Sequence, residues 1–140
     1  MPDSLKLLGI VKKAGFLEIG EDSSGRAVRA GKARLILTAS DASDNSRARA
    51  KNYANAGNVP HLILSNTKYE IGLEVGRGSP GMLTITDIGL AASFVKKLAA
   101  ENPEVYGNIA EDLSQLEARQ KKRKAKAHDK DLKTGKRRMK

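Results

Sequence analysis

The sequence predicts an α/β fold: a three-layer α/β/α sandwich with a central mixed four-stranded sheet, followed by a basic C-terminal tail. Short apolar runs alternate with segments of helical periodicity over about a hundred residues. That order places helices on the faces of a sheet. The apolar runs show little polar alternation, which indicates strands that are covered on both faces.

The chain begins with a predicted helix and a short strand. Apolar side chains at helical spacing predict a helix from about Ser4, with Asp3 or Ser4 as its cap, that ends at Gly15. The run from Phe16 to Ile19 then reads as a strand that ends at Gly20.

A weak helix, a buried strand and a second helix follow. We expect the weak helix over 23–30, with Ser23 or Ser24 as its cap and Gly25 lowering its stability. Residues 35–38 are a continuous apolar run, as in a buried strand. The helix over 43–56 has Asp41 or Ser43 as its cap.

The second half predicts two more strands and two more helices. A strand over 61–64 follows Pro60, and a short helix covers 67–75. A strand over 82–86 leads to Asp87, which caps a helix with one buried face. We take residues 1–101 as the domain, 102–118 as a linker or extra helix, and 119–140 as a tail that is disordered when free.

The charge is concentrated at the C-terminus. Residues 119–140 hold twelve Lys or Arg and two Asp, which equals the whole net charge of +10. The tail has almost no apolar anchor for a membrane, so we expect it to contact nucleic-acid phosphates. The contacts expected from the tail are Lys121, Lys122, Arg123, Lys124, Lys126, Lys136, Arg137 and Arg138.

Composition argues against several classes of function. The chain has no cysteine and two histidines far apart, so we expect no metal site and no cofactor. No Ser/His/Asp set is recognisable, and His61 lies inside an apolar run, so we expect no enzyme. No apolar run or signal sequence points to a membrane, and a cytoplasmic, monomeric protein is expected.

Three turns are candidate contacts for a polyanion. Residues 20–26 and 40–45 each connect a predicted strand to a predicted helix, whose first N–H groups can bind an anion. Each turn also has a plainer explanation as an ordinary capped turn. A Gly-x-Gly-x-x-Gly sequence spans 76–81, but it follows a helix and precedes a strand, the reverse of a dinucleotide-binding fingerprint. If the strands are parallel, these three segments lie at one edge of the sandwich.

Several segments together resemble a known family. They are Leu7-Leu8-Gly9-Ile10, Gly20-Glu21-Asp22, 33–37, 40–43, Val59-Pro60, Glu70-Ile71-Gly72 and the strand after the glycine loop. Over about 5–98 the chain resembles the kink-turn-binding ribosomal proteins of the L-seven-Ae type, in particular the small bacterial YlxQ-like members. The resemblance implies a non-enzymatic protein that binds structured RNA.

The resemblance also suggests which residues contact RNA. The family's Gly-x-Asn-Glu-x-x-Lys motif corresponds to Gly20, with Asp22, Ser23 and Arg26 in place of its asparagine, glutamate and lysine. Ionised Asp22 only accepts hydrogen bonds, so kink-turn specificity stays open while RNA contact is expected. The predicted site comprises Gly20, Glu21, Asp22, Ser23 and Arg26, with charge from Lys32 and Arg34, a wall of Asp41, Ala42, Ser43 and Arg47, and the loop residues Gly76, Arg77, Gly78 and Ser79.

We therefore predict an RNA-binding protein of the ribosome or its assembly, with ribosomal RNA as its partner. Two alternatives stay open: a module that docks on ribosomal or RNA-processing proteins, and a substrate-recognition domain that works with an RNA-modifying enzyme. Fold analogy alone does not choose between them.

Overall fold

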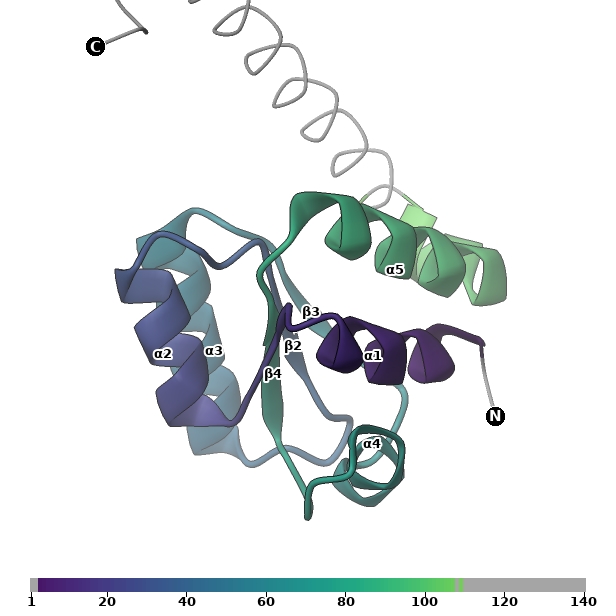
Figure 1. The fold of residues 1–140 in the computed structure, drawn as a ribbon, viewed down its shortest axis with the longest axis horizontal. Helices are drawn as coiled ribbons and strands as arrows, with labels where there is room; N and C mark the ends of the chain where they lie inside the picture. Colours follow the sequence, from purple (N-terminus) through teal and green to yellow (C-terminus); the bar gives the residue numbers. More distant parts are fainter. Residues whose placement is uncertain (1–2, 108, 110–140) are drawn as a thin grey trace, which may run out of the picture.

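The computed structural model describes residues 3–107 and 109. It shows a four-stranded sheet between two layers of helices, as predicted (Figure 1). The elements in chain order are α1 (Asp3–Lys13), β1 (Leu17–Ile19), α2 (Glu21–Arg29), β2 (Leu35–Thr38), α3 (Asp44–Gly57), β3 (His61–Ile63), α4 (Lys68–Val75), β4 (Met82–Ile85) and α5 (Ile88–Glu101).

The sheet is mixed, with the strand order β1-β4-β2-β3. β2 and β3 are parallel, whereas β4 is antiparallel to both β1 and β2. Strands β1, β2 and β3 therefore run in one direction, and β4 alone runs in the other. As a result, the ends of β1, β2 and β3 lie at the same edge of the sheet as the start of β4.

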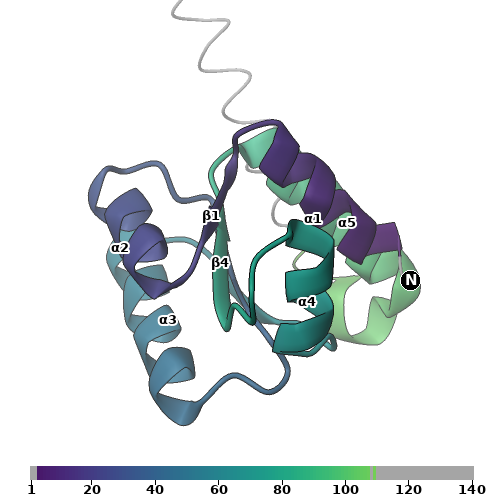
Figure 2. The same ribbon diagram turned by 60° about the horizontal axis from the view of Figure 1, so that its bottom comes forward.

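The helices divide between the two faces of the sheet. Figures 1 and 2 show α2 and α3 on one face, and α1, α4 and α5 on the other. Side chains along β2 alternate between the two faces of the sheet and so pack into both layers of helices. Leu35 and Leu37 belong to the larger core on the side of α1 and α5, whereas Ile36 packs with Ala50, Ala54 and Met82 under α3.

Several expected helix caps differ from those in the structure. α2 begins at Glu21, with Gly20 as its N-cap, so neither Ser23 nor Ser24 caps it. Ser24 is instead fully buried, where its Oγ accepts a hydrogen bond of 2.7 Å from the Thr84 hydroxyl. At α1, the Ser4 N–H and hydroxyl both donate to Glu101 of α5. The expected caps Ser43 and Asp87 are confirmed.

Gly25 has a packing role that its low helix propensity does not reveal. A Cβ at Gly25 would lie 2.7 Å from the Tyr53 hydroxyl oxygen, so a side chain there would displace either the Tyr53 ring or α2. The glycine lowers the propensity of α2 and at the same time allows the two helices to approach closely.

The core continues beyond residue 101. Sequence analysis left 102–118 open between a linker and an extra helix; residues 103–107 and 109 are helical, and the rest of that segment lies outside the described residues. Tyr106 is buried in the larger core, and its hydroxyl donates to Ile63 O at 2.8 Å. Burial and the nearby Glu101 carboxylate raise the pKa of Tyr106 above its ordinary value.

Candidate nucleic-acid interface

Three backbone segments meet at the edge of the sheet where β1 and β2 end and β4 begins. Gly20 N–H donates to Met82 O at 2.8 Å, and Ala39 N–H donates to Gly81 O at 3.1 Å. Because β4 runs opposite to its neighbours, the loop that precedes it joins the turns that follow β1 and β2. We call residues 20–23, 40–43 and 76–81 together the Gly20 edge.

The start of α2 offers backbone N–H groups at this edge. Gly20 has φ of 99°, a left-handed conformation that favours glycine, and no side chain caps the helix. The first N–H groups of a helix have no partner within the helix and attract anions. Asp22 is exposed at the same place, where its carboxylate can accept hydrogen bonds.

The Glu21 side chain faces α3 rather than the open edge. Its Oε2 accepts a hydrogen bond of 2.6 Å from the Ser46 hydroxyl, and its Oε1 lies 3.2 Å from Arg49 Nη1. Glu21 therefore holds the start of α2 against α3 and is already engaged, although sequence analysis placed it among the contacts.

The turn after β2 is likewise held by internal contacts. The Ser43 hydroxyl accepts from Ser46 N–H at 3.1 Å and so caps α3. The Asp41 carboxylate accepts from Lys68 N–H at 2.8 Å, at the first residue of α4. Ala42 is buried in the core, so its side chain is not available to a ligand.

Arg47 is turned back toward this turn. Its Nη2 donates to Ser40 O, whereas its Nε is buried and has no hydrogen-bond partner within the described part of the chain. The guanidinium therefore lies beside residues 40–43, as sequence analysis expected for this wall of the site.

The loop over 76–81 is folded onto α4. Gly76 ends that helix with φ of 70°, and Arg77 N–H donates to Gly72 O at 3.1 Å. The carbonyl groups of Arg77 and Gly78 lie where a Cβ of Gly72 would be, so this approach requires glycine. Residues 76–79 are exposed, which leaves Arg77 at the surface of the Gly20 edge.

Lys12 is a neighbour of this loop that sequence analysis missed. Its Nζ lies 3.5 Å from the position of a Cβ on Gly76. The contact depends on how α1 packs against α4, where Gly9 lets the backbone of Glu74 come close. No local pattern in the sequence predicts the packing of α1 against α4.

Lys32 and Arg34 do not join the Gly20 edge. They follow α2, which carries the chain roughly 13.5 Å back across the sheet, and Arg34 N–H pairs with Ile85 O at the far end of β4. Arg26 lies on α2, between the Gly20 edge and the segment that holds Lys32 and Arg34. It is exposed, and its Nη2 donates to Ser23 Oγ at 3.0 Å.

His61 makes a structural contact. Its Nε2 lies 2.9 Å from Thr38 Oγ1 on the neighbouring strand. Burial, then the positive charges of Lys51 and Arg47, lower the pKa of His61 below its ordinary value, which favours the neutral imidazole.

Neither a cluster of metal ligands nor a membrane-spanning helix occurs in the described part of the chain. In residues 3–107 and 109, no three His, Asp or Glu side chains gather in a way that would hold a metal ion. Among those same residues, no helix is long and apolar enough to cross a membrane. The tail cations predicted to contact phosphates lie outside the described residues.

Solved structures share this fold. A protein of unknown function from Bacillus halodurans C superimposes with a TM-score of 0.64 at 22% identity, over 69% of this chain and 97% of its own. The Giardia lamblia 15.5kD RNA binding protein superimposes with a TM-score of 0.55 at 19% identity, over 69% of this chain and 84% of its own.

Curated relatives are also found by sequence, although no family model matches. The RNA-binding protein YlxQ of Bacillus subtilis (strain 168) is 27% identical over 92 residues, which are 66% of this chain and 91% of YlxQ. The large ribosomal subunit protein eL30 of Dictyostelium discoideum is 31% identical over 83 residues, which are 59% of this chain and 74% of that protein. With this identity and coverage, and with the shared fold, the chain belongs to the L-seven-Ae-type family of RNA-binding and ribosomal proteins.

Proposed function

We propose that this protein is a non-enzymatic RNA-binding protein of the ribosome or of its assembly, and that it holds structured RNA at the Gly20 edge. The observation that carries the proposal is the meeting of three backbone segments there, with an uncapped helix start and the exposed Arg77. Relatives that are named as RNA-binding and ribosomal proteins support it.

The chemistry of the edge suits a folded RNA. The N–H groups at the start of α2 can donate to a phosphate, and the Asp22 carboxylate beside them can accept from the N–H groups of a base. Arg77 on one side and Arg26 on the other add positive charge. This combination favours an RNA whose backbone bends sharply enough to present a phosphate and an unpaired base together.

The basic tail adds contacts of a different kind. With twelve Lys or Arg in 22 residues, it is suited to phosphates of any sequence. We propose that it contributes affinity while the Gly20 edge contributes the recognition of shape. Because the proposed partner is the ribosome, we propose that the protein acts in the cytoplasm.

The proposal is tested by replacing Arg77. We would measure the affinity of Arg77→Ala for ribosomal RNA fragments with an internal loop by fluorescence anisotropy, with a perfect duplex of the same length as the reference RNA. The loss of a charge-assisted contact should weaken binding of the looped RNA about tenfold. The matched control is Lys97→Ala, which removes an exposed cation from α5, a helix that contributes no residue to the Gly20 edge.

Two results would contradict the proposal. One is an equal loss of affinity in Arg77→Ala and Lys97→Ala. The other is the absence of amide chemical-shift changes at residues 20–26 and 76–79 when the full chain is titrated with the looped RNA.

A further inference from the structure

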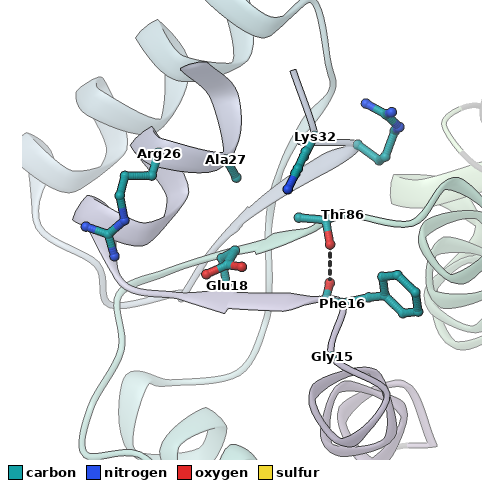
Figure 3. A pocket seen from close by; sticks show the side chains of 8 residues that line it. Gly15, Phe16, Glu18, Arg26, Ala27, Lys32 and Thr86 are labelled. Carbon is teal, nitrogen blue, oxygen red and sulfur yellow. Dashed lines mark hydrogen bonds between the residues drawn. The ribbon is translucent and has the colours of Figure 1, made fainter. Parts of the chain in front are cut away.

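A polar cleft lies at the other end of β1 from the Gly20 edge. It has a volume of about 430 Å³ and opens between α2, β1 and the segment before β2 (Figure 3). The proposed function does not use it, apart from Arg26 at its rim. Its lining includes Phe16, Glu18, Arg26, Lys32 and Arg34.

Three cations and one carboxylate line the cleft: Arg26, Lys32, Arg34 and Glu18. In Figure 3 the Glu18 side chain stands out from β1 between Arg26 on one side and Lys32 on the other. Within residues 3–107 and 109, the one ion pair closer than 4.0 Å joins Arg49 to Glu21. The charged groups therefore line one cleft without forming direct ion pairs with one another.

Arg34 is held in position by the backbone. Its Nη1 donates to Gly31 O at 3.1 Å and to Ala33 O at 3.0 Å. These bonds fix one side of the guanidinium and leave its other N–H groups for a ligand, since the group carries five donors. A cation that is already oriented loses less conformational entropy when it binds an anion.

The two kinds of charge specify a ligand with two kinds of group. Lys32, Arg34 and Arg26 favour a phosphate. The Glu18 carboxylate favours a neighbouring pair of N–H donors, because its two oxygens can each accept one. Guanine presents such a pair on its Watson–Crick edge, in its ring N–H and its amino group, whereas adenine presents only an amino group. The Phe16 ring turns away from Glu18 in Figure 3, so recognition rests on hydrogen bonds and charge.

We propose that this cleft binds an unpaired guanosine nucleotide, with the base on Glu18 and the phosphate on Lys32 and Arg34. This inference rests on the proposed function, since the nucleotide belongs to the RNA held at the Gly20 edge. Arg26 connects the two sites, because it lies on α2 and also lines the cleft. The length of α2, roughly 13.5 Å, is a distance that a few nucleotides can bridge.

The test is a titration of the isotope-labelled full chain with guanosine monophosphate, adenosine monophosphate and inorganic phosphate, followed by NMR. Guanosine monophosphate should shift the amides of Glu18, Lys32 and Arg34 at lower concentration than the other two probes. Glu18→Gln should weaken binding of guanosine monophosphate about tenfold and abolish the preference over adenosine monophosphate. Lys32→Ala should weaken both nucleotides alike, and Lys97→Ala should weaken neither.

Three results would overturn the inference: no shift at these amides, equal shifts with guanosine monophosphate and inorganic phosphate, or a guanine preference that survives in Glu18→Gln. The same samples separate the two proposals. Looped RNA that still shifts residues 76–79, without any nucleotide effect in the cleft, refutes the cleft alone. Nucleotide binding without binding of looped RNA refutes the proposed function.

Discussion

Replacing Gly72 by alanine tests how the Gly20 edge is built. Gly72 lies inside α4, so helix propensity alone predicts that alanine stabilises the protein by about 1 kcal/mol. The tertiary structure predicts the opposite. A Cβ at Gly72 would overlap the Gly78 carbonyl oxygen and would lie 2.5 Å from Arg77 O.

The loss of stability in Gly72→Ala depends on which atoms must move to make room for the Cβ. Both atoms that meet the Cβ are backbone atoms, so no flexible side chain can relieve the overlap. Forcing an extra carbon into a packed contact costs about 1–3 kcal/mol. Moving the loop away also breaks the 3.1 Å bond from Arg77 N–H to Gly72 O, which is worth about 1 kcal/mol. After the gain in propensity, we expect Gly72→Ala to lower the free energy of unfolding by about 1–3 kcal/mol.

The assay is urea unfolding of the full chain, together with anisotropy on looped RNA. The matched control is Gly78→Ala, because a Cβ there meets nothing within 4 Å and Gly78 does not have a positive φ. We expect Gly78→Ala to stay within about 0.5 kcal/mol of the parent, whereas Gly72→Ala should also lose affinity as Arg77 moves. A Gly72→Ala protein that is as stable as the parent, or more so, would refute this account of the loop.

Three further predictions concern other parts of the molecule. Deletion of residues 119–140 should weaken RNA binding and flatten its salt dependence, since about ten contacts to single-stranded phosphates contribute a log–log slope near −7; equal slopes in titrations with salt would contradict the role of the tail. Because the pKa of His61 is lowered in the folded state, its contribution to stability is present above the ordinary value of 6.5 and is lost as the pH falls toward the folded pKa. His61→Gln should therefore reduce the loss of stability on acidification in urea unfolding at several pH values, and an unchanged loss would contradict this role of His61. Ser24→Ala should lower the free energy of unfolding by about 1–3 kcal/mol because it leaves the buried Thr84 hydroxyl without its acceptor, and adding Thr84→Val should recover most of that loss; a double variant no better than the single one would exclude this explanation.

The architecture was predictable from local signals. Apolar runs without alternation occur where strands are covered on both faces, and β2 is buried along its whole length. The caps Ser43 and Asp87 were also predictable, because a side-chain oxygen at the start of a helix acts on N–H groups within the same turn.

The start of α2 was predicted wrongly for a reason that lies outside the local sequence. Ser23 and Ser24 have the side chains of typical caps. However, the Gly20 N–H donates to Met82 O, and α2 begins at Glu21, two residues before the predicted start at Ser23. Ser24 is then carried into the interior, where Thr84 gives it a partner. A tertiary hydrogen bond thus overrides a local preference.

The meeting of the three candidate segments was predicted from the wrong premise of parallel strands, since a parallel β4 would place the loop before it at the opposite edge of the sheet. The turns at 20–23 and 40–43 and the loop at 76–81 come together, because the reversed direction of β4 returns the chain to the edge where β1 and β2 end. The charges expected to help them do not all lie there. Lys32 and Arg34 are close to Gly20 in sequence but lie one helix length away in space.

The sequence by itself determined the order of helices and strands, the burial of the strands and the position of the charge, because these depend on the periodicity and chemistry of neighbouring residues. Only the tertiary structure decided which polar side chains are free to bind. Glu21 and Asp41 are engaged by Ser46 and by the start of α4, whereas Glu18 and Lys32 share an open cleft. The reason is that hydrogen bonds between distant segments depend on how the helices cross the sheet, and no local pattern encodes that geometry.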